Sequence, residues 1–149
     1  MLKQMSVQTR EQTVERLTAA LEPRPEILEA YLFGSVARGE AQPHSDLDVA
    51  VYVTDEALAK PGFGYAAELS ADLQQTLARS DVDIVILNRA TPLLYHRVLR
   101  DGVRLISRDL AATTRRAGQA LSRYCDDLPR LRLIEQAHRA RIGSGDFGR

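Results

Sequence analysis

Cysteine is almost absent from this sequence, because Cys125 is the only one among 149 residues. A lone cysteine cannot form an internal disulfide, and no His stands near it at the spacing of a metal site. The three histidines, His44, His96 and His138, share no ligand spacing either. We therefore expect these four residues to be structural or to face solvent, and the protein to work in the reducing cytoplasm.

Long hydrophobic runs are also absent. No apolar run approaches the roughly 20 residues that a membrane-spanning helix needs. The first residues, MLKQMSVQTREQ, lack the apolar core of a secretory signal peptide. We expect a cytoplasmic protein that does not contact the membrane.

The sequence has no excess of positive or negative charge, since its formal net charge is zero. General nucleic-acid binders carry a basic patch, so we expect no direct nucleic-acid binding. Residues 1–107 nevertheless hold 11 Lys and Arg against 15 Asp and Glu, whereas residues 108–149 hold 9 Arg against 5 acids. The basic C-terminal segment could dock on an acidic partner or on phosphate, or it could be a solvated helix face.

The hydrophobic pattern predicts one α/β domain, and 149 residues suit a single core. Apolar residues at helical spacing predict a helix from Val7 to Leu21, which ends before Pro23. β-Branched and apolar runs predict the strands, and we expect them to form a small mixed sheet flanked by helices. The other predicted elements are strands at 27–33, 47–53, 82–87 and 103–106, a loop at 57–64, and helices at 65–79 and 92–99.

The C-terminal segment has a helical pattern of its own. From Leu110 onward, apolar residues alternate spacings of four and three, which is typical of a helix with one narrow apolar seam. Pro129 disfavours helical geometry at the residue before it, so we expect a break or a kink near Leu128. We divide the chain into a domain, 1–107, and a helical arm, 108–149, that packs on the domain or on a partner. The predicted seam consists of Ala117, Leu121, Tyr124, Leu128 and Leu131.

Two aspartates, Asp46 and Asp48, stand at the start of the predicted strand 47–53. Side chains alternate along a strand, so both carboxylates point to the same face. At roughly 5 Å and an effective dielectric near 20, their repulsion is on the order of 3 kcal/mol. Such repulsion raises a carboxyl pKa or requires a cation, and Mg²⁺ with oxygen ligands meets that requirement.

A third carboxylate can reach the same place from the strand 82–87. Asp83 stands between two apolar residues of that strand and can join Asp46 and Asp48 if this strand lies beside the strand 47–53. Asp81 shares the face of Asp83, and the pattern favours Asp83 without excluding Asp81. Three carboxylates around one or two metal ions are typical of phosphoryl transfer.

Gly34 and Ser35 follow the first predicted strand, where the chain should turn into a helix. The glycine allows close backbone approach, and the following amides can bind a phosphate oxygen. This is not a P-loop, because Glu40 and Ala41 stand where Lys and Ser or Thr are required. Arg38 and Ser45 could contact phosphate, or they could be an exposed arginine and a turn cap.

These residues resemble the nucleotidyltransferase superfamily of DNA polymerase beta. The pattern is Gly34-Ser35, ten residues, Asp46-x-Asp48, and then an acid in a later strand. Within that superfamily, GSVARGEAQPHSDLDVAV is similar to the minimal nucleotidyltransferases, the MNT family. The resemblance implies a polymerase beta-like fold and transfer of a nucleoside monophosphate from ATP, with release of pyrophosphate. It also implies that Asp46 and Asp48 hold Mg²⁺, that Asp83 binds one metal and assists deprotonation, and that Gly34 and Ser35 grip the triphosphate.

The resemblance implies a partner as well. MNT proteins are often antitoxins of HEPN-domain ribonucleases, in a system where the antitoxin adenylylates a tyrosine of the toxin. Two alternatives stay open: AMP transfer to a small molecule of the aminoglycoside type, and a non-catalytic module that sequesters its partner. Residues 109–149 are few for an acceptor-binding domain. A cluster of three acids is not needed for sequestration.

Overall fold

The computed structural model describes residues 8–40, 45–61 and 64–144. Four strands form one sheet in the order β3-β2-β1-β4. The strand β1 is antiparallel to β2 and to β4, whereas β2 and β3 are parallel. This mixed sheet confirms the predicted fold class. The strands are β1 (Ile27–Phe33), β2 (Leu47–Val53), β3 (Val82–Ile86) and β4 (Val103–Ser107).

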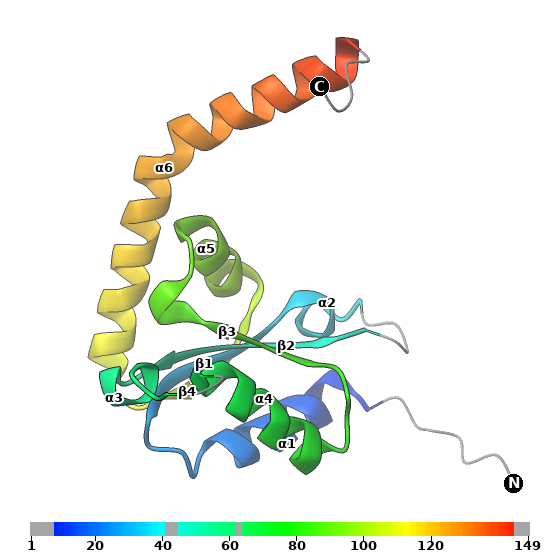
Figure 1. The fold of residues 1–149 in the computed structure, drawn as a ribbon, viewed down its shortest axis with the longest axis vertical. Coiled ribbons are helices and arrows are strands. Elements are labelled where there is room, and N and C mark those ends of the chain that lie inside the picture. Colours follow the sequence, from blue (N-terminus) through cyan, green and yellow to red (C-terminus); the bar gives the residue numbers. More distant parts are fainter. Residues whose placement is uncertain (1–7, 41–44, 62–63, 145–149) are drawn as a thin grey trace, which may run out of the picture.

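Helices cover both faces of the sheet (Figure 1). On one face lie α1 (Arg10–Leu21) and α4 (Gly64–Leu77). On the other lie α5 (Pro92–Asp101) and the first half of α6 (Leu110–Ser144). Three short elements complete the domain: α2 (Gly34–Ala37), α3 (Asp55–Leu58) and the 3₁₀ turn η1 (Leu87–Arg89).

Local signals place the helix starts. Thr9 and Gln12 form a reciprocal capping box at the start of α1, and the predicted residue Val7 lies outside the described residues. The Thr91 hydroxyl caps α5, whose first residue is Pro92, as predicted. Part of the predicted loop 57–64 is instead helical, because the Thr54 hydroxyl accepts a hydrogen bond from the amide of Ala57 and caps α3.

Alternation along β2 divides the core into two layers. Its odd-numbered residues pack against α1 and α4, and its even-numbered residues face α5 and α6. Asp48 therefore belongs to the α5 and α6 side of the sheet. The first layer includes Leu17, Val49, Val51, Leu69 and Leu73; the second includes Tyr31, Ala50, Tyr95, Val98 and Ala120.

The helix α6 continues through Pro129 and changes direction in its middle (Figure 1). The predicted break or kink is therefore a bend within one helix. In the first half, the Tyr124 ring stacks on the His96 ring of α5, with centroids 3.8 Å apart. Leu121 does not join this contact, because its side chain is 50% exposed, and Ala120 is buried in its place. Leu121 of the predicted seam therefore does not pack on the domain.

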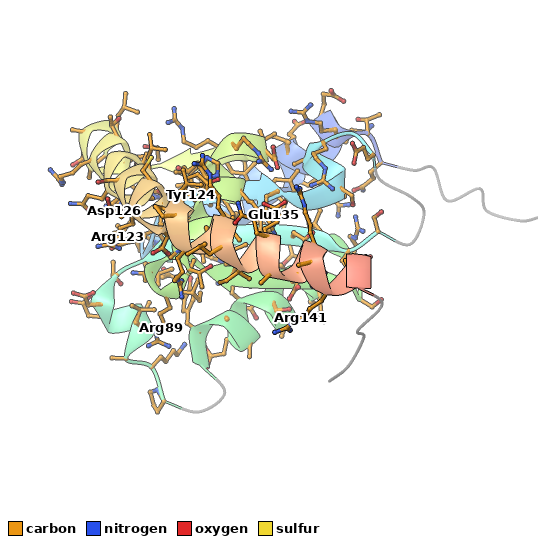
Figure 2. All side chains as sticks on the ribbon, turned by 90° about the horizontal axis from the view of Figure 1, so that it is seen from above. Arg89, Arg123, Tyr124, Asp126, Glu135 and Arg141 are labelled. Carbon is orange, nitrogen blue, oxygen red and sulfur yellow. The ribbon has the colours of Figure 1, made fainter. Side chains whose placement is uncertain are left out.

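The second half of α6 lies apart from the core. Every residue from 132 to 143 is exposed, including Leu133, Ile134 and Ile142. Seen from above, this half crosses over the domain, and the labelled Glu135 and Arg141 mark its course (Figure 2). Over the described ranges, no helix is long and apolar enough to span a bilayer.

Candidate active site

The strand β1 ends beside the predicted carboxylates. Phe33, its last residue, pairs with Asp48 of β2. The chain then turns at Gly34, whose φ of +77° is a conformation that side-chain-bearing residues rarely adopt. A Cβ built at position 34 would collide with Oδ2 of Asp48. Glycine is therefore required here both for the turn and for the approach of the Asp48 carboxylate.

The short helix α2 is anchored at this turn. Val36 and Ala37 are buried, and Ser35 is half-buried between them and Gly34. The amide of Arg38 donates to the carbonyl of Gly34 at 3.2 Å, and the amide of Glu40 donates to that of Ser35 at 2.9 Å. These bonds hold the Gly34-Ser35 turn against the end of β1.

Asp48 and Asp83 stand side by side across the parallel pair β2 and β3. Burial is the largest cause that raises the pKa of Asp48, followed by the negative charges of Asp83 and then Asp46. The positive charge of Arg38 opposes this shift. The structure thus places Asp46 and Asp83 within electrostatic reach of Asp48.

The carboxylates of Asp46, Asp48 and Asp83 are the residues of this site that could hold a metal ion. Asp46 and Asp83 are exposed and can reorient cheaply, whereas Asp48 is half-buried beside the backbone of Gly34. In the described parts of the chain, no three His, Cys, Asp or Glu side chains already converge at metal-binding geometry. The donor set of carboxylate oxygens is nevertheless the one that Mg²⁺ prefers.

Asp81 has a different partner. The Arg79 guanidinium binds both of its carboxylate oxygens at 3.0 Å and donates to the Ser45 carbonyl at 2.9 Å. Hydrogen bonding to Arg79 lowers the pKa of Asp81. Since Asp81 is held by this ion pair, the geometry favours Asp83 as the third carboxylate. Sequence reasoning missed Arg79, although its place two residues before Asp81 was a usable signal.

The two remaining candidates lie close to this region. Arg38 is exposed, and its Nε donates a hydrogen bond to Glu40 at 3.1 Å. Its positive charge nevertheless acts on Asp48 and opposes the rise in the pKa of that carboxyl. Ser45 is half-buried, and its carbonyl ties the start of β2 to Arg79. Of the histidines, His138 is exposed, and His44 lies outside the described residues. Cys125 is exposed on α6.

A second polar cluster lies farther along the same face, and sequence reasoning missed it. Glu29 of β1 is fully buried, and its carboxylate accepts a hydrogen bond from Arg116 Nε of α6 at 2.7 Å. The hydroxyls of Tyr31 and Tyr95 donate to the same carboxylate at 3.0 and 3.3 Å. Burial raises the pKa of both tyrosines, so they remain protonated donors. The signal was an acid within the apolar run ILEAYLF.

Several solved structures that are similar to this chain are toxin–antitoxin complexes. A toxin–antitoxin complex with AMP-PNP contains a chain that is 26% identical, with a TM-score of 0.69 over 84% of this chain and 98% of that one. A mutant MntA toxin–antitoxin complex gives 27% identity and a TM-score of 0.66, over 83% and 96%. A tri-AMPylated Shewanella oneidensis HEPN toxin in complex with MNT antitoxin gives 24% identity and a TM-score of 0.64, over 87% and 98%.

No curated protein matches the chain. A protein-family comparison does agree with the structural likeness. The family described as "Polymerase beta, Nucleotidyltransferase" matches residues 15–111, which is more than half of the chain and includes β1 to β4. The Gly34 turn and the strands that carry Asp48 and Asp83 all lie within the match. The chain therefore belongs to the polymerase beta nucleotidyltransferase family.

Proposed function

We propose that this protein is an antitoxin that acts on a partner HEPN ribonuclease. It transfers AMP from ATP to the hydroxyl of a tyrosine of that partner, in an Mg²⁺-dependent reaction. The observation that carries the proposal is the meeting of Asp48, Asp83 and the Gly34 turn at one place on the sheet. A nucleotidyltransferase needs its metal carboxylates next to a triphosphate-binding turn, because its catalysis is mostly positioning and charge neutralisation.

Asp46, Asp48 and Asp83 would hold the Mg²⁺. Burial raises the pKa of Asp48 most, and repulsion from Asp83 and Asp46 raises it further; a bound divalent ion would remove that repulsion, so the arrangement favours cation binding. Bound Mg²⁺ neutralises the charge that develops on the phosphates and orients the reacting oxygens. Half-burial of Asp48 fixes one ligand, and the exposed Asp46 and Asp83 can adjust to the ion.

The Gly34 turn would hold the triphosphate. With no side chain at residue 34, a phosphate can approach the backbone closely, and the Ser35 hydroxyl can donate to one of its oxygens. Arg38 would exchange its exposed Glu40 partner for a phosphate oxygen at little cost, because surface ion pairs contribute about 0–1 kcal/mol. Ser45 would contact the phosphates from the start of β2.

In the reaction, the acceptor hydroxyl oxygen forms a bond with the α-phosphorus of ATP. The bond between the α-phosphorus and the oxygen that bridges to the β-phosphate breaks, and pyrophosphate leaves with that oxygen. Asp83 assists removal of the hydroxyl proton, which passes to solvent. The products are an AMP ester of the acceptor and pyrophosphate.

The exposed half of α6 would bind the partner. Leu131, Ile134, His138 and Ile142 follow one another at spacings of three, four and four, so they form one stripe along the helix. Arg130, Arg139 and Arg141 lie among them, and this suits a groove that is apolar inside and acidic at its rim. The toxin–antitoxin assembly of similar solved chains supports this assignment.

The test is incubation with Mg²⁺ and ATP labelled at the α-phosphate, with and without a candidate HEPN protein. We expect label and one or more AMP masses on the HEPN protein, and none after Asp46→Ala with Asp48→Ala. The matched control is Asp55→Ala with Glu56→Ala, which removes two neighbouring exposed acids from α3 and should leave transfer unchanged.

Each of the other outcomes contradicts part of the proposal. Label on an aminoglycoside-type hydroxyl compound, but not on protein, would mean a small-molecule adenylyltransferase. A tight complex without any transfer, unaffected by loss of Asp46 and Asp48, would mean a module that sequesters its partner.

A further inference from the structure

The chain just before β2, where Asp46 stands, is tied to the segment that leads into β3. The carbonyl of Ser45 accepts a hydrogen bond from Nη2 of Arg79 at 2.9 Å. The amide of Leu47 donates to the carbonyl of Asp81 at 2.8 Å. Both neighbours of Asp46 are therefore held in place, although Asp46 itself is exposed.

Arg79 makes this connection rigid, because it also binds the side chain of Asp81. Its Nε and Nη2 donate to the two carboxylate oxygens of Asp81, each at 3.0 Å. Since Nη2 carries two hydrogens, it binds Asp81 and the Ser45 carbonyl at the same time. A bidentate pair of this kind fixes the direction of the planar guanidinium as well as its distance. The arginine therefore holds Ser45 at a defined position relative to Asp81.

The end of α4 determines where Arg79 lies. Ala78 follows this helix with a φ of +51°, the left-handed conformation that favours glycine. Its amide donates to the carbonyl of Gln75 at 3.4 Å, and the amide of Arg79 donates to that of Gln74 at 3.0 Å, which are the two bonds of a Schellman motif. An alanine keeps this backbone only where the surrounding structure holds it. The hydrogen bonds of the Arg79 side chain contribute to that support.

The charge of Arg79 and its positioning effect would act on a metal ion in opposite directions. The hydrogen bonds to Asp81 raise the pKa of Arg79 most, and the negative charge of Asp46 raises it further, so Asp46 lies within electrostatic reach. A guanidinium alone would repel a divalent cation bound there. Because Asp81 balances this charge, the pair as a whole is neutral. We therefore expect the placement of Asp46 to be the larger effect.

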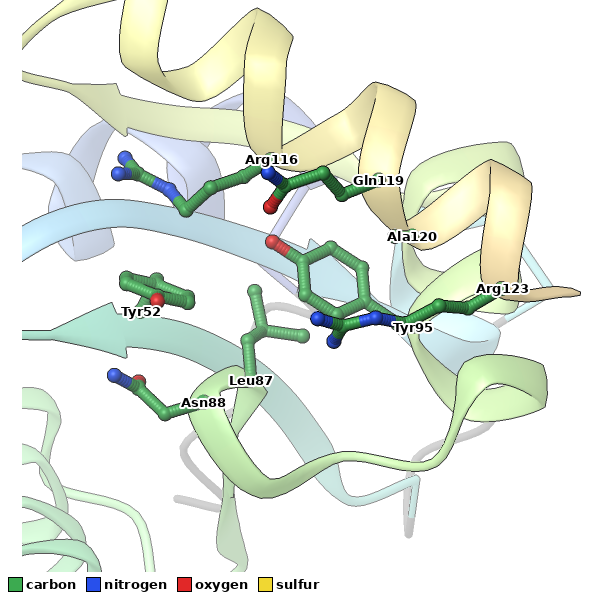
Figure 3. A pocket seen from close by; sticks show the side chains of 8 residues that line it. All are labelled: Tyr52, Leu87, Asn88, Tyr95, Arg116, Gln119, Ala120 and Arg123. Carbon is green, nitrogen blue, oxygen red and sulfur yellow. The ribbon is translucent and has the colours of Figure 1, made fainter.

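The other end of β2 is anchored without Arg79. The Asn88 side chain exchanges two hydrogen bonds with the backbone of Val53, at 3.0 and 2.8 Å. The Arg116 guanidinium of α6 lies over the Tyr52 ring, with its central carbon 4.5 Å from the ring centroid (Figure 3). Loss of the Arg79 bonds would thus free the start of the strand and leave its other end in place.

We propose that Arg79 is a positioning residue for the metal site. Held by Asp81, it fixes the backbone around Asp46 and so presents that carboxylate to the ion beside the other two. The inference rests on the proposed function, because it requires that Asp46 binds the metal. Groups that orient a metal ligand typically change metal affinity by about 10–100-fold.

The test is binding of Mn²⁺, measured by the EPR signal of the free ion, to the full-length protein without nucleotide. Arg79→Gln with Asp81→Asn removes the ion pair without changing the net charge. We expect this variant to bind Mn²⁺ roughly tenfold more weakly than the wild type. The matched control is Arg24→Gln with Asp72→Asn, which removes an ion pair between the end of α1 and α4. It should leave the affinity within about twofold, because distant sites act independently.

A double-mutant cycle determines whether Arg79 acts through Asp46. In an Asp46→Ala background, loss of the ion pair should change Mn²⁺ affinity less than about twofold. Thermal unfolding verifies that each variant is folded at the temperature of the titration. Arg79→Lys is a second variant that keeps the charge but loses the planar fork, and it should also bind Mn²⁺ more weakly than the wild type.

Wild-type affinity in both Arg79 variants would mean that the ion pair only stabilises the fold, and would overturn the inference. Tighter binding by the neutral double variant, or an equal loss with and without Asp46, would overturn it as well. All three results would leave the metal site itself standing. If Asp46→Ala alone left Mn²⁺ binding unchanged, the proposed metal site would be wrong, and the role of Arg79 with it.

Discussion

The Asp48 carboxylate lies where the first side-chain carbon of residue 34 would stand. This contact joins the turn after β1 to the second strand, so Gly34 determines the position of the central acid. It also explains why the glycine and the second aspartate belong to one pattern in the sequence.

Gly34→Ala should therefore damage both stability and AMP transfer. An alanine at positive φ costs roughly 1–2 kcal/mol, and its methyl group would push Asp48 out of place. Denaturant unfolding and label transfer to the partner measure the two effects. The control is Gly118→Ala, in the exposed part of a helix with open space around it, which should stabilise by roughly 0.5–1 kcal/mol. Normal transfer by Gly34→Ala would contradict the proposed site.

Asp48→Asn should stabilise the metal-free protein at neutral pH. The folded pKa of Asp48 is above the unfolded value of 3.8. Ionisation is therefore disfavoured in the fold, and the ionised form lowers stability above that pH. Thermal unfolding at pH 7 should show a higher Tm for the variant, with the gain shrinking as the pH falls toward 4. A gain independent of pH would show that another effect is responsible.

Asp81→Asn should have the opposite effect on stability and destabilise the protein at neutral pH. Arg79 lowers the folded pKa of Asp81 below 3.8, so the ion pair stabilises the fold above that pH and the contribution is lost as pH falls through the folded pKa. We expect a loss of roughly 1.5–3 kcal/mol at pH 7, the range for hydrogen bonds to charged groups. The measurement is urea unfolding at pH 7 and pH 3. Equal stability of variant and wild type at pH 7 would contradict the pairing.

Arg116→Met should destabilise strongly, because it leaves the fully buried Glu29 without its cation. Breaking a buried ion pair in this way costs about 3–5 kcal/mol. The double change Glu29→Gln with Arg116→Met should cost less than Arg116→Met alone, since no charge stays buried. Arg115→Met, an exposed neighbour, is the control and should lie within about 0.5 kcal/mol of the wild type. A double variant as unstable as Arg116→Met would argue against this explanation.

A chain that ends at Leu131 should keep the fold, because every described residue from 132 to 143 is exposed. A chain that ends at Ser107 should not, because it loses Arg116 and the buried Ala120 and exposes the Tyr95 side of the core. Circular dichroism melting distinguishes the two. Cooperative unfolding of the shorter chain at the wild-type temperature would overturn this prediction.

Local patterns predicted most of the elements correctly. The runs 27–33 and 47–53 match β1 and β2 because β-branched residues and short length favour strands. The bend in α6 was predictable from Pro129, since proline removes one helical hydrogen bond. The sequence could not predict which face of α6 is buried, because that depends on where α5 lies. For that reason Ala120 is buried and Leu121 is exposed.

Long-range pairings were beyond sequence reasoning. Glu29 and Arg116 are 87 positions apart, and no local pattern connects them. The choice between Asp81 and Asp83 depended on Arg79, whose hydrogen bonds occupy Asp81. The spacing pattern predicted that Gly34 and Asp48 lie close together, as they do, but it could not reveal the collision that excludes a side chain at residue 34.

Because α6 bends at Pro129, a small change in the bend angle moves the end of the helix over a large distance. At 1.5 Å per residue, the stretch from Pro129 to Ser144 is roughly 22 Å long, and it has no core contact to steady it. A change of about 10° at the bend would move the tip by roughly 4 Å. That is about three quarters of the 5.4 Å pitch of a helix on a facing surface. Pro129 in the middle of the helix thus sets where the far end can reach, although it touches neither the carboxylates nor the Gly34 turn.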